Sequence, residues 1–133
     1  MKQVATKPII LYAEDDFDDF DSLKEALDEL SDNHLLMHAK NGADAVSFIE
    51  NSTVLPSLII LDLNMPIMDG KEVLFWLENR NQYKHIPIIV FTTSSREDDV
   101  KLCKDHNCTF FLKPTSYNDL LHVAQTMLKF CEQ

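Results

Sequence analysis

The chain has 133 residues, of which 45% are hydrophobic and 26% charged, a composition typical of one soluble globular domain. Its formal net charge of −10 disfavours direct binding to nucleic acid and to anionic lipid, and no apolar run approaches the length of a membrane span. Residues 1–7 are too short and too polar for a signal peptide, so we expect a cytoplasmic location.

Short apolar runs alternate with helical patterns along the whole chain. Residues 9–13 predict a buried strand, and the apolar side chains of Phe20, Leu23, Leu27 and Leu30 then recur every three or four residues, as on an amphipathic helix. Further strands are predicted at 34–39, 58–61, 88–91 and 109–112, and further helices at 43–50, 71–79, 96–105 and along 120–131.

This alternation predicts the α/β class, with helices on both faces of a doubly wound parallel sheet. We expect a five-stranded (βα)5 sheet of the flavodoxin-like order 2-1-3-4-5. No repeat or linker divides the sequence. We therefore expect residues 1–133 to form a single domain, with a core at about 8–131 and no separate output domain.

Polar side chains follow four of the predicted strands, at the points where those strands end. Glu14 and Asp15 follow the first strand, Asp62 the third, Thr92 the fourth and Lys113 the fifth. Ligands of open parallel sheets bind beyond the carboxyl ends of the strands, near the switch point of the strand order. We therefore expect these side chains to meet at one edge of the sheet.

An acidic run over residues 14–21 contains six carboxylates in eight residues. We expect Asp18, Asp19 and Asp21 to stabilise and solubilise the first turns of the following helix, where negative charge is favourable. Asp16 could serve either at the start of this helix or in the functional site. We assign Glu14 and Asp15, which directly follow the first strand, to the functional site, because polar residues also follow the third, fourth and fifth strands.

Converging carboxylates repel one another unless a cation lies between them. Mg²⁺ takes a few carboxylate oxygens and coordinates phosphate, so Asp15, Asp62 and a nearby main-chain carbonyl are suitable ligands, with Mn²⁺ as a substitute ion. A site with Glu14, Asp15 and Asp62 at −3, and with the ion and Lys113 at +3, is neutral and suits an incoming anion. A carboxylate attacks phosphorus when cations neutralise the transferred oxygens, which makes Asp62 the candidate nucleophile.

Four stretches of the sequence carry a family resemblance: "IILYAEDD", "LIILDLNMPIMDG", "IPIIVFTTSS" and "FFLKPTS". In this order and at these separations they resemble the signature stretches of response-regulator receivers, the CheY-like domains of two-component systems. They run from residue 9 to residue 116, so the resemblance covers most of the chain. It implies a phosphorylation-dependent switch whose phosphoryl donor is a sensor histidine kinase or a phosphotransfer protein.

Carried over position by position, the resemblance assigns a metal ion to Asp15, Asp62 and the main-chain carbonyl of Asn64, with Glu14 reaching the ion through water. It makes Asp62 the phosphoacceptor and Lys113 the lysine that binds the phosphoryl group. Thr92 corresponds to the hydroxyl that moves toward that group. The surface of the fourth helix, fifth strand and fifth helix would then change and carry the output.

The chain departs from the family pattern at two positions. Glu14 stands where many relatives have Asp, and its longer side chain should still serve the metal. Phe110 stands where chemotaxis regulators have Tyr, so a switch that couples it to Thr92 must act through packing. The resemblance also implies a cis peptide between Lys113 and Pro114, which costs little at an X-Pro bond.

The last predicted helix is followed directly by the end of the sequence. We therefore expect output through an unknown partner or a place within a phosphorelay, and leave a homodimer open. The protein would catalyse its own modification and would not otherwise be an enzyme. Within the family, residues 79–100 and 110–121 resemble small stand-alone regulators found beside phytochrome-like kinases.

Three other classes fit the residues less well. A haloacid-dehalogenase-type phosphohydrolase typically has a second acid two residues after its nucleophile, where this chain has Asn64. A flavodoxin-like cofactor carrier needs a phosphate loop after the first strand, where this chain has its acidic run. A pseudo-receiver that only binds partners would have lost site residues, and here each of them is present.

The three cysteines form no CxxC pair, so we expect reduced thiols and no disulfide. Cys103, His106 and Cys108 lie close in sequence but lack a fourth ligand for zinc. We expect them to serve in packing. The five histidines show no ligand spacing and are assigned to the surface or to packing.

Overall fold

Five parallel strands form one sheet in the computed structural model, which describes residues 7–132. The strands are β1 (Ile9–Ala13), β2 (Leu35–Ala39), β3 (Leu58–Leu61), β4 (Ile88–Thr92) and β5 (Thr109–Leu112). Their order is β2-β1-β3-β4-β5, and every neighbouring pair is parallel. The predicted fold class and strand order are confirmed. Met1 to Thr6, to which the signal-peptide expectation mainly refers, lie outside the described residues.

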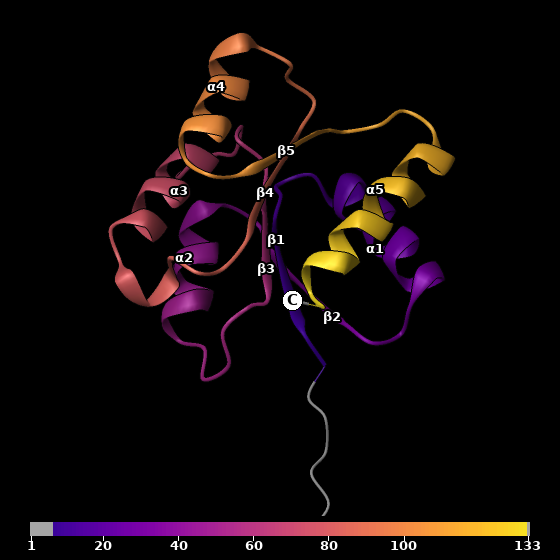
Figure 1. Cartoon of the computed structure of the whole chain (residues 1–133), viewed down its shortest axis with the longest axis horizontal. Coiled ribbons are helices and arrows are strands. Elements are labelled where there is room, and N and C mark those ends of the chain that lie inside the picture. The colour runs from indigo at the N-terminus through magenta and orange to yellow at the C-terminus, as the bar shows by residue number, and fades with distance from the viewer. Residues whose placement is uncertain (1–6, 133) are drawn as a thin grey trace, which may run out of the picture.

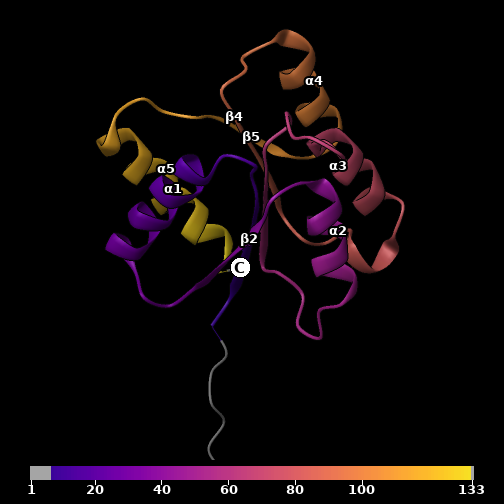
Figure 2. The ribbon, with the colours of Figure 1, turned by 180° about the vertical axis from the view of Figure 1, so that it is seen from behind.

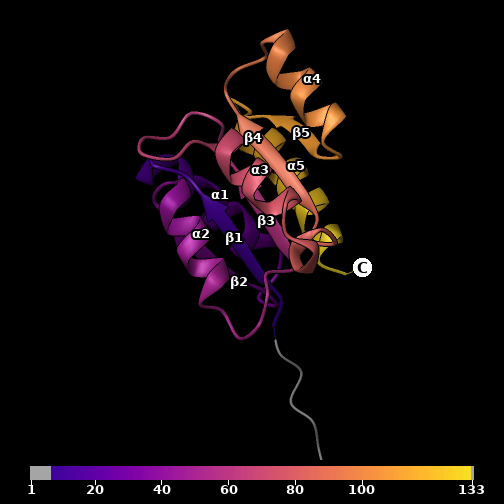
Figure 3. The same ribbon diagram turned by 90° about the vertical axis from the view of Figure 1, so that its left-hand side faces the viewer.

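Helices cover both faces of the sheet (Figure 1). The α-helices are α1 (Phe17–Leu30), α2 (Gly42–Glu50), α3 (Gly70–Glu78), α4 (Glu97–Asp105) and α5 (Tyr117–Phe130). α1 and α5 lie together on one side of the sheet, and α2, α3 and α4 on the other, as the view from behind also shows (Figure 2). Figure 3 looks onto the α2, α3 and α4 side. None of the helices among residues 7–132 is long and apolar enough to cross a membrane.

The two cores follow from the alternation of side chains along each strand. Leu11 and Ile59 point to the α2 and α3 side, where they pack with Val73 and Leu77. Their strand neighbours Ile10, Tyr12, Leu58 and Ile60 pack on the opposite side with α1 and α5. Because both faces are covered, β1 and β3 are buried almost throughout, which explains their continuous apolar sequences.

Two helices begin at aspartates that accept hydrogen bonds from free main-chain N–H groups. Asp16 is the N-cap of α1, and its Oδ1 accepts from the N–H groups of Asp18 at 2.9 Å and Asp19 at 3.1 Å. This contact gives Asp16 a capping role, one of the two roles that the sequence left open. Asp69 caps α3 in a capping box with Glu72.

Gly70 lets α3 begin directly against the end of β3. A Cβ at this position would lie 2.3 Å from the main-chain oxygen of Asp62 and 2.9 Å from Cα of Leu63. No side chain fits there unless the backbone beyond β3 moves. Gly70 therefore allows the start of α3 to lie directly against Asp62, the residue that follows β3.

The boundaries differ from the predictions by one to three residues, most at α5, which begins at Tyr117 and not at residue 120. β2 begins at Leu35, which pairs with Ile9, while the ring of His34 lies beside Asp28 with Nε2 3.1 Å from Oδ1. β4 continues through Thr92, which pairs with Leu112 of β5. A short 3₁₀ helix at Asn81–Tyr83, which the sequence analysis did not anticipate, joins α3 to β4.

Candidate functional site

Two adjacent central strands bring the predicted carboxylates together. Ala13 of β1 pairs with Leu61 of β3, so the residues that follow them, Glu14 and Asp62, leave the sheet side by side. The N–H of Asp62 donates to the oxygen of Ala13 at 3.1 Å, which continues the ladder past the strand ends. Ligand atoms of Glu14, Asp15 and Asp62 all lie within 4.8 Å of one another. Among residues 7–132, this is the one group of three or more potential ligands that converges in this way.

The burial of the three acids differs strongly. Glu14 is 1% exposed and Asp62 7%, whereas Asp15 is exposed. Asn64 lies on the loop beyond, where its N–H donates to Oδ1 of Asp62 at 3.1 Å. Carboxylate oxygens at this spacing fit a hard divalent cation that is partly buried and partly open to solvent.

Lys113 is the cation that reaches this cluster from the protein itself. Its N–H donates to the oxygen of Thr92 at 2.7 Å, which anchors it beside the end of β4. Its Nζ donates to Oε1 of Glu14, to Oδ2 of Asp62 at 3.2 Å and to Oδ2 of Asp19 at 2.8 Å. The side chains of Lys113, Glu14 and Asp62 are at most 10% exposed, so these two ion pairs are largely shielded from water, whereas the side chain of Asp19 is 42% exposed.

Burial and nearby charges shift the pKa values of Glu14 and Lys113. Burial raises the pKa of Glu14 to about 7, although the contact with Lys113 acts to lower it and the charge of Asp62 acts to raise it. Burial alone would lower the pKa of the Lys113 ammonium, but its hydrogen bonds with Asp19 and Glu14 hold that pKa above its usual range. The lysine is therefore charged at neutral pH, and the proton of Glu14 depends on what else occupies the site.

Thr92 and Phe110 lie on the side of the site toward α4. Thr92 is fully buried, and its Oγ1 accepts a hydrogen bond of 3.3 Å from the N–H of Ser94. Ser94 in turn donates through Oγ to Oδ2 of Asp99 in α4 at 3.0 Å. Phe110 is half-buried in a small apolar cluster that includes Cys103.

One expectation for this region was wrong. None of the peptide bonds that the structure describes is cis, so Lys113 and Pro114 are joined by a trans bond. The trans form is the more stable one for X-Pro by about 0.5–1 kcal/mol. Here Lys113 already reaches the carboxylates through it, and its own N–H is satisfied by Thr92.

Sequence reasoning missed three side chains that contact the site. The hydroxyl of Tyr12 donates to Oε1 of Glu14 at 2.9 Å, and Nε2 of His38 lies 2.7 Å from the main-chain oxygen of Glu14. Asp19, which was expected only to support the start of α1, contacts Lys113. The alternation of β1 puts Tyr12 and Glu14 on the same face and could have identified the first of these contacts.

Cys103, His106 and Cys108, which the sequence analysis assigned to packing, do not form a metal-ligating group within residues 7–132. Cys103 is buried against Val90 and Leu63, while Nδ1 of His106 contacts the carboxylate of Glu78. The three cysteines are free thiols.

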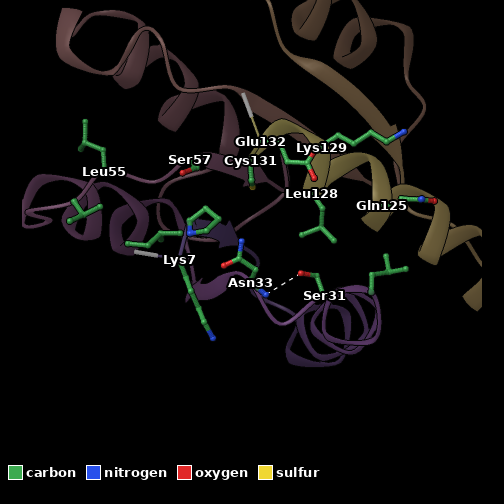
Figure 4. A pocket seen from close by; sticks show the side chains of 14 residues that line it. Lys7, Ser31, Asn33, Leu55, Ser57, Gln125, Leu128, Lys129, Cys131 and Glu132 are labelled. Carbon is green, nitrogen blue, oxygen red and sulfur yellow. Dashed lines mark hydrogen bonds between the residues drawn. The ribbon is translucent and has the colours of Figure 1, made fainter. Parts of the chain in front are cut away.

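A separate hollow of about 700 Å³ lies at the opposite, amino-terminal edge of the sheet (Figure 4). The start of β1, the turn after α1 and the last turn of α5 line it. Figure 4 shows the side chains of Lys7, Lys129 and Glu132 among its described lining residues. Glu132 is the single carboxylate among them, so this hollow offers no comparable cation site.

Comparisons with known proteins agree on one family. Residues 10–125 match the family described as "Response regulator receiver domain". The chain is 33% identical over 128 residues to the response regulator Rcp1 of Synechocystis sp., across 92% of this chain and 87% of that protein.

Two solved structures of similar proteins superpose on nearly the whole chain. The phosphorylated cyanobacterial phytochrome response regulator RcpA does so with a TM-score of 0.86 at 27% identity, covering 96% of this chain and 95% of that one. The Mn²⁺-bound form of Rcp1 gives a TM-score of 0.81 at 32% identity, covering 92% and 93%. The fold that holds these carboxylates is thus shared with one protein solved in a phosphorylated form and with another solved with Mn²⁺ bound.

Proposed function

Because the chain belongs to the family of response regulator receiver domains, we propose that it accepts a phosphoryl group on Asp62 from a sensor histidine kinase or a phosphotransfer protein. The observation that carries this proposal is the position of Asp62. Its carboxylate lies at the end of a central strand, 3.2 Å from the ammonium of Lys113 and within reach of the carboxylates of Glu14 and Asp15.

The reaction is a displacement at phosphorus. A carboxylate oxygen of Asp62 forms the new P–O bond while the P–N bond of a phosphohistidine breaks, and the imidazole leaves with the bonding electron pair. The product is an acyl phosphate, and its oxygens carry more negative charge than the carboxylate did. Lys113 and the hydroxyl of Thr92 are the groups of this chain that we assign to those oxygens.

The metal site is assigned to Mg²⁺, held by Asp15, Asp62 and the main-chain carbonyl of Asn64, with Glu14 reaching it through water. A divalent ion there would supply positive charge to the transferred oxygens. The chemistry of the donors supports this choice, because carboxylate and carbonyl oxygens suit Mg²⁺ and Mn²⁺ better than softer ions. The chain would act only on itself, and a partner that recognises the phosphorylated form would carry the output.

Phosphorylation by a small donor tests this function. Wild type incubated with acetyl phosphate and Mg²⁺ should gain the mass of one phosphoryl group, and chelation of the metal should prevent the gain. Asp62→Asn should show none, because an amide is not a nucleophile toward phosphorus. A phosphorylated Asp62→Asn protein with the label on another acid of the site would remove Asp62 from its role. Phosphotransfer from purified histidine kinases would then identify the natural donor.

A further inference from the structure

The first turn of α1 contributes a carboxylate that competes for the site lysine. Oδ2 of Asp19 lies 2.8 Å from Nζ of Lys113, closer than the 3.2 Å that separates Nζ from Oδ2 of Asp62. Asp19 is not among the converging metal-ligating carboxylates, and its side chain is 42% exposed.

The side chain of Asp19 does not cap the helix. Asp16 is the N-cap, and it is the main-chain N–H of Asp19, not its side chain, that takes part in the capping contact. The contact between the side chain of Asp19 and Lys113 therefore needs another explanation than helix capping.

The hydrogen-bonding capacity of Lys113 is fully used in this arrangement. An ammonium has three N–H groups, and here Glu14, Asp19 and Asp62 take one each. A phosphoryl oxygen that binds Lys113 must replace one of these acceptors.

Asp19 is the acceptor that can leave most easily. The side chain of Glu14 is 1% exposed and that of Asp62 10%, and both follow central strands directly, whereas Asp19 stands on a helix. Asp19 and Lys113 also line a hollow of about 220 Å³ between α1 and the start of α5, which gives the carboxylate room to swing outward.

The charge of Asp19 also opposes the incoming group. With the proposed divalent ion bound, Glu14, Asp15 and Asp62 would balance that ion and Lys113, so Asp19 would leave the site with one excess negative charge before a phosphoryl group arrives.

From these observations we infer that Asp19 is a positioning residue that holds Lys113 in the resting site and releases it when a phosphoryl group binds to Asp62. This inference rests on the proposed function and deepens it. The strength of the contact between Asp19 and Lys113 then sets how readily the protein accepts a phosphoryl group. A weaker contact favours the phosphorylated form.

Asp19→Asn tests the inference, with Asp18→Asn as its matched control. Both variants remove one negative charge from the same turn, but Asp18 is exposed and lies outside the contacts of Lys113. With acetyl phosphate and Mg²⁺, Asp19→Asn should be phosphorylated about twofold to fivefold faster than wild type, the range expected for a partly exposed ion pair. Its apparent Kd for beryllofluoride should fall by a similar factor. Asp18→Asn should match wild type in both measurements.

A second readout follows the lysine directly. In the absence of any phosphoryl donor, the side-chain ¹⁵N signal of Lys113 should shift in Asp19→Asn and remain in place in Asp18→Asn. Thermal unfolding of both variants checks that they are folded. Equal phosphorylation rates in both variants, or an unmoved Lys113 signal in Asp19→Asn, would overturn this inference while Asp62 keeps its role. A wild type that takes neither a phosphoryl group nor beryllofluoride would overturn the proposed function and this inference with it.

Discussion

Tyr12 donates a hydrogen bond of 2.9 Å from its buried hydroxyl to Oε1 of Glu14, two residues farther along the same chain. Both side chains leave β1 on the face toward α1, where the ring of Tyr12 stacks on Phe20 with centroids 5.7 Å apart. Burial, followed by the charge of Glu14, holds the pKa of Tyr12 far above its usual value. The hydroxyl therefore keeps its proton and remains a donor. It fixes the carboxylate that Lys113 also contacts.

The first prediction removes this donor. Tyr12→Phe should lower the free energy of unfolding by about 1 to 2 kcal/mol, because a buried oxygen of Glu14 loses a charge-assisted hydrogen bond. Urea denaturation at pH 8 measures the change. Tyr117→Phe is the matched control, since the Tyr117 hydroxyl donates to Glu29 at 2.8 Å on the exposed surface. If Tyr117→Phe lowers the free energy of unfolding as much as Tyr12→Phe does, burial of the Glu14 contact adds nothing to its contribution.

The second prediction concerns pH. The pKa of Glu14 rises from its ordinary 4.5 to about 7 in the folded metal-free protein, mainly through burial. Between these values the folded state binds a proton that the unfolded state has released, so the free energy of unfolding should decrease as pH rises through this window. We expect a loss on the order of 1 to 3 kcal/mol from pH 5 to pH 8.

Glu14→Gln isolates this contribution. The difference between wild type and Glu14→Gln, measured by urea denaturation in a chelator, should contain the pH dependence that Glu14 provides. Mg²⁺ should bind wild type more tightly as pH rises toward 7, because the metal requires the carboxylate. Parallel pH profiles for the two proteins would contradict the assignment of this proton to Glu14.

The third prediction separates a metal ligand from its acidic neighbours. Asp15→Ala should weaken Mg²⁺ binding at least about tenfold, because its ligand atom lies with those of Glu14 and Asp62. Asp18→Ala should have a much smaller effect, since Asp18 is exposed and lies outside this group. Calorimetric titration of each variant measures both affinities. Equal losses would show that the acidic run acts as a diffuse field and not through individual ligands.

The strands, their order and the strand-end carboxylates could be predicted because they depend on local patterns. β1 and β3 are continuous apolar runs, and a parallel sheet necessarily places Glu14 and Asp62 at the same edge. The contact of Asp19 with Lys113 could not be predicted in this way. It joins residues 94 positions apart, and it depends on how α1 packs beside the end of β5.

The trans bond before Pro114 was missed for a different reason. The expectation of a cis bond came from the family resemblance, while the chain itself offers no signal that selects either isomer. The role of Asp16 was equally hidden, because an aspartate before a helix suits both capping and metal binding until its partners are known.

Hydrogen bonds connect Thr92, at the end of β4, to α4. Its Oγ1 accepts from the N–H of Ser94, whose Oγ donates to the buried Asp99 in the first turn of α4. Asp99 also lies 3.6 Å from Nζ of Lys71 at the start of α3. If the Thr92 hydroxyl turns toward a phosphoryl oxygen, its hydrogen bond with the N–H of Ser94 breaks, and α4 loses this connection to β4. We therefore expect a movement of Thr92 to change the position of α4 before that of α5.

The fourth prediction is that Phe110 transmits this movement through packing. Phe110 is half-buried against Val90 and Cys103, so it already occupies the interface between β5 and α4 and can turn further inward once Thr92 moves. Beryllofluoride in the presence of Mg²⁺ should change hydrogen exchange in residues 94–120 of wild type by about tenfold, or about 1.4 kcal/mol of opening free energy. Phe110→Ala should reduce this change.

The neighbouring residue on β5 gives the control for this last experiment. Phe111 lies on the opposite face and packs with the α1 and α5 core, so Phe111→Ala removes a ring of the same size without touching the interface with α4. It should lower overall stability while the beryllofluoride response in α4 persists. If exchange instead changes only in the loops around Asp62, and residues 94–120 stay as they were in wild type, Phe110 does not carry the signal. The output face must then lie elsewhere, because the site would have bound the phosphoryl mimic without moving α4.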